Sequence, residues 1–366
     1  MRVGDKHFQS IWVNENDSRI IQVIDQRALP FQLIIKDLHT PDDVIYAISE
    51  MVVRGAPLIG VTAAFGVYLA VMKFKDSRNA DNLIQEAAIT IKETRPTAVN
   101  LEMAVDLQLK AIQYGQSMDE KLQISFDTAF RFMHEEILAS KNIGLYGKNI
   151  IEEIAKTKNG SPVNILTHCN AGWLATVDFG TASAPIYLAH DSGIPVHVWV
   201  DETRPRNQGA RLTAWELGKH GVSHTIIVDN AGGHLMQMGK VDIVIVGSDR
   251  TALNGDTANK IGTYLKALAA YDNDVPFYVA LPVSSIDWTL EKGLNNIPIE
   301  ERSEDEIHFI DGLSSHNKLE QIRITPENSK AVNYGFDVTP AKFICGIITD
   351  KGICKANTQE IKKWAP

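Results

Sequence analysis

The second half of the chain repeats one pattern, in which a short apolar run ends in polar or glycine residues and a helical stretch follows. The runs are VNILTHC (163–169), PVHVWVDE (195–202), SHTIIVDN (223–230), VDIVIVGSD (241–249), VPFYVALP (275–282) and FICGIITD (343–350). Strands buried on both faces read as continuous apolar runs, and their alternation with helices is typical of a parallel sheet. The sequence therefore predicts a doubly wound α/β domain.

The first part of the chain has a different pattern. Short apolar bursts within residues 1–35 predict a small antiparallel sheet, and Thr40-Pro41-Asp42 is a good helix start. Further helical runs are predicted at 79–93, 98–114 and 118–157. We therefore predict an N-terminal domain of a short antiparallel sheet plus helices at 1–145 and the α/β domain at 146–366. The polar stretch at 290–335 is predicted to be an excursion before the last strand.

Composition excludes several classes of partner. The net charge of −9 argues against binding to nucleic acid or to an anionic membrane, although a local cluster of arginines can still bind a small phosphate. The three cysteines, Cys169, Cys345 and Cys354, are too few for a disulfide framework, which favours a cytoplasmic protein. We expect neither a signal peptide nor a membrane span, because no sufficiently long apolar segment is present.

The polar ends of the apolar runs are the candidate site, since ligands bind beyond the carboxyl ends of strands in open parallel sheets. Cys169 follows the first run, and the turn after it can place the thiol at a helix N-terminus, which lowers a thiol pKa. A structural role as a small buried residue stays open for Cys169. His168 is its neighbour on the strand and points to the opposite face, so we expect it to support the turn from behind. No second Cys or His stands at ligand spacing, so we expect no metal.

Two further motifs carry polar groups suited to a ligand. DETRPRNQGARLTAWEL (201–217) contains Gln208, which can read hydroxyl groups, although the segment can also be a solvated loop that leads into a helix. GSDRTALNGDTANKIGTY (247–264) contains Asp249, and we expect Asn259 and Lys260 to open a helix suited to an anion. A role for Asp249 in capping or in pairing with Arg250 stays open.

Two arginines of the N-terminal part stand at expected helix starts. Arg54 lies in VVRGAPLIG and Arg95 in KETRPTAVN, each just before a residue that begins a helical run. In each case a simple helix break is the alternative. Because the helical part must pack on the sheet, the two guanidinium groups are placed to clamp a phosphate from above.

Seven motifs, in this order, resemble the methylthioribose-1-phosphate isomerase family: RGAPLIG, TRPTAVNL, THCNAG, DETRPRNQGARLTAWEL, GSDRTALNGDTANKIGTY, PFYVALPVSSID and FDVTPAKFICGIITDKGI. The resemblance covers nearly the whole chain and extends to the related exchange-factor regulatory subunits of translation initiation and to ribose-1,5-bisphosphate isomerases. It implies an aldose–ketose isomerase of methionine salvage that converts 5-methylthioribose 1-phosphate to 5-methylthioribulose 1-phosphate. It also implies a Rossmann-like C-terminal domain, a homodimer, and no cofactor or metal.

The resemblance implies roles for nine residues. Cys169 and Asp249 match the catalytic pair, and seven others match substrate-binding positions: Arg54, Gly55, Ala56, Arg95, Gln208, Asn259 and Lys260. The substrate's anomeric carbon is blocked by phosphate, so the sugar ring must open first. Asp249 is our candidate acid for the ring oxygen, which requires a site that raises its pKa. Cys169 then acts as the base at C2 or assists a direct hydride shift, and we expect closure of the N-terminal domain to exclude water.

Three alternatives stay open. The first is a 5-deoxyribose 1-phosphate isomerase, or one that accepts both sugars. A methylthio group needs an apolar slot, which Trp173, Trp288 or Met residues can build or shrink, and loss of one small apolar group changes binding by only ~1–3 kcal/mol. A ribose-1,5-bisphosphate isomerase needs a second basic cluster, and the motifs show no surplus arginines. A catalytically silent regulatory protein would be favoured by loss of the Cys and Asp pair, but this chain keeps both.

Overall fold

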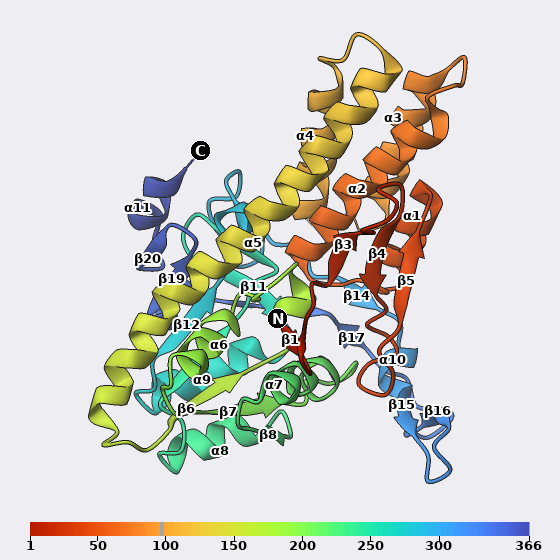
Figure 1. Cartoon of the computed structure of the whole chain (residues 1–366). Helices are drawn as coiled ribbons and strands as arrows, with labels where there is room; N and C mark the ends of the chain where they lie inside the picture. Colours follow the sequence, from red (N-terminus) through yellow and green to blue (C-terminus); the bar gives the residue numbers. More distant parts are fainter. Residues whose placement is uncertain (96–98, 366) are drawn as a thin grey trace.

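A computed structural model describes residues 1–95 and 99–365 of the chain. All six predicted strands lie in one seven-stranded sheet of order β20-β19-β12-β9-β6-β7-β8 (Figure 1). Its strands are β6 (Val163–Thr167), β7 (Val196–Asp201), β8 (His224–Ile227), β9 (Ile243–Val246), β12 (Phe277–Ala280), β19 (Gly346–Thr349) and β20 (Gly352–Cys354). Only β20 runs antiparallel to its neighbour within this sheet. The predicted parallel sheet is therefore confirmed.

Helices cover both faces of this sheet, which is why its strands are apolar throughout. All four residues of β9 are fully buried, and alternate ones face different cores. Ile243 and Ile245 pack with the helices of one face, whereas Val244 and Val246 pack with those of the other. The first face carries the C-terminal half of α5 (Met118–Thr157), α6 (Ala184–Asp191) and α7 (Ala214–His220), and the second carries α8 (Ala231–Gln237) and α9 (Thr263–Asp272).

The strand order reverses between β6 and β9. From β6 the chain builds outward through β7 and β8, and from β9 it builds the other way through β12 and β19. The crevice outside the carboxyl ends of strands at such a reversal is where open α/β sheets bind ligands. Cys169 lies two residues beyond β6, and Asp249 lies three residues beyond β9.

The N-terminal part also follows the prediction. Strands β3 (Ile11–Val13), β4 (Ile21–Ile24) and β5 (Ile35–Leu38) form an antiparallel sheet, and β1 (Arg2–Val3) pairs with β2 (Lys6–His7). The helices are α1 (Pro41–Ser49), α2 (Ala56–Phe74), α3 (Ala80–Glu93) and α4 (Val99–Ile112), followed by α5. The predicted start at Thr40 is confirmed, because its side chain accepts a hydrogen bond from the Asp43 amide in a capping box.

Helix α5 joins the two halves of the molecule (Figure 1). It runs for 40 residues without a break, and so it passes through position 145. Phe132 and Met133, in its first half, pack in the core of the helical bundle, whereas Ile143 and Ile151 pack in the core of the sheet. A division of the chain at 145 stays a prediction, and it falls where this helix passes from one core to the other.

Helix α2 is long and apolar enough to span a membrane, the one such helix among the described residues. Of the apolar window, 83% is buried inside the protein. Its side chains contact the other bundle helices on all sides, so it is the central helix of the bundle core.

A second sheet, of order β13-β10-β11-β18, was not predicted. Its strands are β10 (Arg250–Ala252), β11 (Thr257–Lys260), β13 (Ile286–Asp287) and β18 (Phe336–Thr339). The Asn254-Gly255-Asp256 turn folds β10 and β11 into an antiparallel hairpin, with Gly255 at a φ of +91°. The expectation that Asn259 and Lys260 open a helix is therefore wrong, because both lie on β11 and α9 begins at Thr263.

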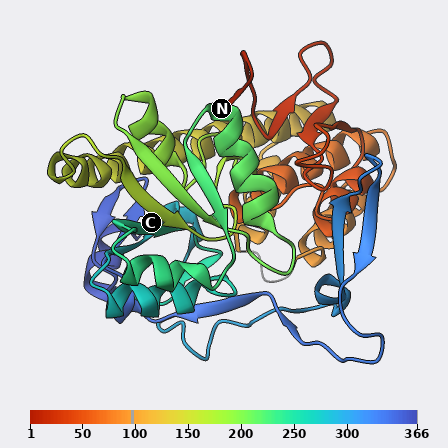
Figure 2. The same cartoon turned by 90° about the horizontal axis from the view of Figure 1, so that it is seen from below.

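The predicted polar excursion at 290–335 runs along the outside of the molecule, from the sheet to the side where the bundle lies (Figure 2). Within it, β14 (Glu301–Arg302) pairs with β17 (Asn333–Tyr334), and β15 (Phe309–Leu313) pairs with β16 (Leu319–Arg323) in a projecting hairpin. Helix α10 (Asp305–His308) precedes the hairpin, and α11 (Thr358–Ile361) follows the last strand of the large sheet.

Candidate active site

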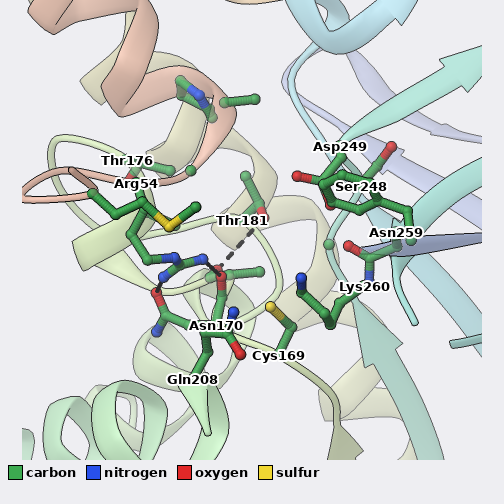
Figure 3. Close-up of a pocket in the computed structure, with 18 of the residues that line it drawn as sticks. Arg54, Cys169, Asn170, Thr176, Thr181, Gln208, Ser248, Asp249, Asn259 and Lys260 are labelled. Carbon is green, nitrogen blue, oxygen red and sulfur yellow. Dashed lines mark hydrogen bonds between the residues drawn. The ribbon is translucent and has the colours of Figure 1, made fainter. Parts of the chain in front are cut away.

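One pocket brings together all nine residues that the resemblance singled out (Figure 3). It lies between the start of α2 and the carboxyl ends of β6 and β9, and it holds about 760 Å³ of empty space, part of it open to solvent. The nine residues are Arg54, Gly55, Ala56, Arg95, Cys169, Gln208, Asp249, Asn259 and Lys260. Pro96 and Thr97 of the TRPT motif lie outside the described residues.

The backbone of Cys169 is held at both ends in an unusual conformation. Its φ is +67°, a region that residues other than glycine rarely adopt and that recurs at functional sites. Its N–H donates to Thr203 Oγ1 at 2.9 Å, and its carbonyl accepts from Thr213 Oγ1 at 2.8 Å. The sulfur consequently faces the pocket on the side of Lys260 (Figure 3).

The structure does not realise the possibility that a helix N-terminus lowers the pKa of Cys169. The helix that follows, η1 (Trp173–Ala175), starts four residues later and is a single 3₁₀ turn, so the thiol does not sit at a helix N-terminus. Only 8% of Cys169 is exposed, and this burial raises the pKa of the thiol, against the opposing effect of Arg54 and Lys260. The resting pocket therefore favours the neutral thiol.

His168 points away from the pocket, as its place on the strand predicts. Its Nδ1 lies 2.8 Å from Asp201 Oδ2, and its Nε2 lies 2.8 Å from the Ile261 carbonyl oxygen. His168 thereby connects the turn at Cys169 to Ile261, the residue that follows Lys260. His168, Asp201 and Asp229 are the one group of potential metal ligands among the described residues. The ammonium of Lys266 lies 3.0 Å from Asp201 Oδ2 and donates to the Asp229 carbonyl, so a positive charge already occupies this cluster.

Asp249, the candidate acid, lies in a site that raises its pKa. It follows β9, and its N–H donates to the Ala258 carbonyl of β11 at 2.9 Å. Burial raises the pKa of its carboxyl, while Lys260, Arg54 and Arg95 act in the opposite direction. The neighbouring Arg250 lies 3.6 Å from Asp287 and contributes to the wall of an adjoining pocket.

Three polar side chains complete this side of the pocket. Lys260 is 8% exposed, its ammonium lies 5.0 Å from the centre of the Phe336 ring, and burial lowers its pKa. Asn259 Nδ2 donates to Thr263 Oγ1 at 3.1 Å. Gln208 is buried, and its Oε1 has no hydrogen-bond partner among the described residues. A buried acceptor without a partner suits a hydroxyl-bearing ligand.

Arg54 and the first turn of α2 form a second polar wall. Arg54 donates to Asn170 Oδ1 and, over 2.8 Å, to the Asn170 carbonyl oxygen, which holds one edge of the guanidinium. No carboxylate lies within 4 Å of Arg54 or Lys260 in the described part of the chain. Two cations without a carboxylate partner, beside the N-terminus of a 19-residue helix, suit an anionic ligand.

Gly55→Ala is expected to destabilise the protein and to weaken binding at this wall. Gly55 has a φ of +94°, and a Cβ there would lie 2.3 Å from the Ala175 carbonyl oxygen. The backbone must shift to relieve this clash, which we expect to cost about 2–4 kcal/mol of unfolding free energy. Denaturant unfolding measures this cost. Gly160→Ala is the control, because it also replaces a glycine of positive φ, at +87°, but meets no atom within 4 Å. Equal losses in both variants would contradict a role for the close approach.

The rim of the pocket includes Glu300 and Arg302 of the excursion, which the sequence did not single out. Arg302 lies 2.7 Å from both Glu300 and Glu306, and Arg206 lies 2.9 Å from Glu306. Burial acts to raise the pKa of Glu306, but hydrogen bonds from Arg302 and Arg206 lower it to about 2. Arg95 lies 3.4 Å from Glu300, so the excursion and the bundle meet here. The sequence shows only a charged stretch, and its return to the pocket depends on tertiary packing.

The expectation that Trp173 or Trp288 shapes the slot for the sugar's 5-substituent is wrong. Trp173 is fully buried in the core of the sheet, where its ring lies 6.0 Å from that of Trp215. Trp288 packs against the core on the other face of the sheet. Neither lines the pocket. Each tryptophan follows a strand of its sheet, and its side chain packs against the hydrophobic core and not into the pocket.

An adjoining compartment is lined mainly by apolar residues. It opens from the main pocket beside Gly55, Ala56, Arg95 and Asp249 and continues between α2, β11 and the excursion. Its other lining residues are Ile59, Arg250, Ala258, Ile297, Pro298 and Phe336. The combined site is thus polar around Cys169 and Lys260 and mostly apolar in the adjoining compartment.

Comparisons with known proteins identify the family to which the chain belongs. Residues 52–356 match the initiation factor 2 subunit family. Methylthioribose-1-phosphate isomerase from Desulfatibacillum aliphaticivorans is 54% identical over 366 residues, which covers all of this chain and 99% of that protein. The crystal structure of 5-methylthioribose 1-phosphate isomerase from Pyrococcus horikoshii OT3 matches with a TM-score of 0.84 and 37% identity, and covers 98% of this chain and 96% of that one.

The wider family includes proteins of translation. The crystal structure of translation initiation factor eIF-2B, subunit delta, from A. fulgidus matches with a TM-score of 0.81 and 34% identity. The match covers 98% of this chain and all of that one. Fold alone therefore does not separate the two groups, whereas overall identity is higher to the isomerase. With its fold, its pocket and these similarities taken together, the chain belongs to the methylthioribose-1-phosphate isomerase family, within the initiation factor 2 subunit family.

Proposed function

We propose that this protein is an aldose–ketose isomerase that converts 5-methylthioribose 1-phosphate to 5-methylthioribulose 1-phosphate in methionine salvage. The convergence of Cys169, Asp249 and the seven binding positions in one pocket carries the proposal. The name of the full-length relatives at 54% identity supports it. The presence of both Cys169 and Asp249 speaks against a silent regulatory protein.

The phosphate binds against Arg54 and the first turn of α2, with Lys260 on the opposite side. Protonated Asp249 gives its proton to the ring oxygen, and the bond from this oxygen to C1 breaks. Gln208 accepts a hydrogen bond from a sugar hydroxyl, which would give its buried Oε1 the partner it otherwise lacks. Hydrogen then moves from C2 to C1. The C2 hydroxyl loses its proton to the Asp249 carboxylate, which regains its acid form, and the C2 oxygen becomes the ketone while the phosphate stays on C1.

Cys169 acts at the C2 hydrogen in one of two ways. As a thiolate it removes a proton from C2 and returns a proton to C1 through an enol phosphate. As a neutral thiol it assists a hydride that moves directly from C2 to C1. The burial of Cys169 raises its pKa and so supports the second route, whereas the nearby Lys260 and Arg54 support the first. Incorporation of deuterium from D2O at C1 of the product distinguishes the two routes.

The adjoining compartment accounts for the 5-substituent. A methylthio group is apolar and fits among Ile59, Ala258, Ile297 and Pro298. A second phosphate at this end would need its own cations, but Arg95 is paired with Glu300, and Arg250 with Asp287. This argues against a 1,5-bisphosphate substrate. A 5-deoxy sugar also fits, with fewer contacts.

Ile297→Ala is expected to change the preference between the two sugars. The shorter side chain loses contact with the methylthio group, so kcat/KM for the methylthio sugar should fall about tenfold, while that for the 5-deoxy sugar changes less. Steady-state kinetics with both sugars measures the ratio. Leu294→Ala is the control, because Leu294 is 48% exposed and does not line the compartment. An unchanged ratio in Ile297→Ala would place the 5-substituent elsewhere.

The direct test is turnover. Purified protein is incubated, without added metal, with 5-methylthioribose 1-phosphate and separately with 5-deoxyribose 1-phosphate, and ketose formation is followed by NMR in D2O. Faster turnover of the methylthio sugar is expected. No turnover of either sugar by folded protein would overturn the proposal. Ribose 1,5-bisphosphate as a third substrate tests the remaining enzymatic alternative.

We further propose a cytoplasmic homodimer. The resemblance to the family supports the dimer, as do large apolar side chains exposed on the excursion and its hairpin: Leu313, Leu319, Ile322, Ile324, Val332 and Tyr334. The free thiols of Cys169, Cys345 and Cys354 suit a reducing compartment. Light scattering after size-exclusion chromatography measures the mass, and a monomer at micromolar concentration would contradict the dimer.

A further inference from the structure

A buried carboxyl that the proposed reaction does not use lies behind Arg54. Glu216, on α7, has no exposed surface. Its Oε1 accepts from the Leu174 amide at 2.9 Å and from Asn170 Nδ2 at 3.1 Å, and its Oε2 accepts from the Tyr187 hydroxyl at 3.1 Å. Three donors, two from the segment that follows β6 and one from α6, therefore converge on one carboxyl group. Such a fully bonded buried group fixes the orientation of its partners.

Asn170 connects this carboxyl to the pocket. Its Nδ2 donates to Glu216 and, over 3.2 Å, to Thr213 Oγ1, which leaves Oδ1 to face Arg54. Arg54 donates to that Oδ1 and to the Asn170 carbonyl oxygen. A rotated amide would point its two N–H donors at the guanidinium, which has only donors. Glu216 thus determines which face of the Asn170 amide meets Arg54.

The turn after Cys169 is shaped to admit Glu216. A Cβ at Gly172 would lie 1.6 Å from Glu216 Oε2, so the carboxyl packs directly on the backbone of the Asn170-Ala171-Gly172 turn. Any larger residue at 172 would displace it. The same turn places Cys169 and Asn170 on the pocket wall.

We propose that Glu216 is a positioning residue that sets the Asn170 amide and thereby holds Arg54 in the orientation that binds the substrate phosphate. This inference rests on the proposed function, in which Arg54 is a phosphate ligand. Arg54 needs such support because, among the described residues, its guanidinium donates hydrogen bonds to atoms of Asn170 alone. A guanidinium that is already held at one edge loses less conformational entropy when its remaining N–H groups bind a ligand.

Charges around Glu216 agree with the geometry. Burial raises the pKa of the Glu216 carboxyl to about 7, against the effects of Asn170, the Leu174 amide, Tyr187 and the charge of Arg54. The amino group of Met1 and the Tyr187 hydroxyl are the other titratable groups that interact with it. At pH values above this pKa, the ionised carboxyl offsets part of the charge of Arg54 across the Asn170 amide.

The experiment is a double-mutant cycle on KM. Glu216→Ala is expected to raise KM for the sugar phosphate roughly tenfold to a hundredfold, with a smaller change in kcat, since a hydrogen-bond chain to a charged group is lost. In an Arg54→Ala background the same change should raise KM no further, because the residue it acts through is absent. Glu216→Gln keeps an oxygen for Asn170 and Leu174 and should restore KM to within about threefold of the wild type.

Glu136→Ala is the matched control. Glu136 on α5 is also buried, its pKa is also raised by burial to about 7, and it accepts a hydrogen bond from Ser284 Oγ, but it does not line the pocket. Its KM should stay at the wild-type value. If Glu216→Ala does not fold, Asn170→Ala cuts the same chain and should show the same rise and the same lack of additivity. Equal rises in the wild-type and Arg54→Ala backgrounds, or no rise at all, would overturn the inference. Absence of turnover in wild-type protein would instead refute the proposed function.

Discussion

Cys169→Ala is expected to lower kcat by roughly 10²–10⁴-fold, the range for loss of a positioned proton-transfer group. The Cys169 thiol faces Lys260 in the pocket. The Cys169 backbone is held by the hydroxyls of Thr203, which follows β7, and Thr213, which precedes α7. Those bonds involve only the main chain of Cys169, so the variant should fold. Single-turnover kinetics with the methylthio sugar measures the loss. Cys345→Ala, at an exposed cysteine, is the control and should keep full activity.

Cys169→Ser separates the two possible routes. A serine hydroxyl does not ionise near neutral pH, so a base mechanism predicts that Ser and Ala lose activity alike. A neutral donor mechanism predicts that Ser keeps a measurable part of kcat. Deuterium at C1 of the product formed in D2O supports the proton-transfer route. A kcat for Cys169→Ala within threefold of the wild type would remove Cys169 from the chemistry altogether.

Asp249→Asn is expected to cost a similar factor, roughly 10²–10⁴ in kcat, because the amide cannot protonate the ring oxygen. Burial raises the pKa of Asp249, so its acid form persists to higher pH than that of an ordinary carboxyl. Activity that requires this acid form should be full below the raised pKa and should fall as pH rises through it. The pH dependence of kcat measures this limb, and Asp249→Asn should lack it.

The control for this variant is Asp287→Asn, whose carboxyl pairs with Arg250 outside the main pocket. It should keep the pH dependence of the wild type. A variant Asp249→Asn with wild-type kcat would move the acid to another group of the pocket. Glu300 would then be the first to test, since it also lines the pocket and raises the pKa of Asp249.

The large sheet and the bundle could be predicted because their residues carry local signals. A run such as IVIV in β9 is buried on both faces wherever it sits in a parallel sheet. Thr40 and Asp43 mark the start of α1, because they form a capping box between residues that are close in the sequence. The site could be located because polar residues that end parallel strands meet at one edge.

The parts that could not be predicted depend on contacts between distant segments. Lys260 lies on β11 because β10 and β18 pair with that strand, although the sequence there also resembles a helix start. Arg302 reaches the rim only because the excursion returns to the bundle. Trp173 fills the core, because a turn directs its side chain away from the pocket that its neighbour Asn170 lines. Local periodicity contains none of this information.

Helix α5 limits how this site can open. Arg54 and Arg95 stand on the bundle, whereas Cys169 and Asp249 stand on the sheet, so an opening hinge between the two would have to bend α5 where it passes from one core to the other. Helix α5 contains no proline and no π-bulge at this point, so we expect it to resist bending. This argues against the closure of the N-terminal domain that we expected from the sequence: substrate would instead enter by movement of the charged rim on the excursion, and the bundle would stay fixed. We expect slow hydrogen exchange at amides 134–143 of α5 and faster exchange at 300–306 of the excursion. The reverse order would show that α5 bends.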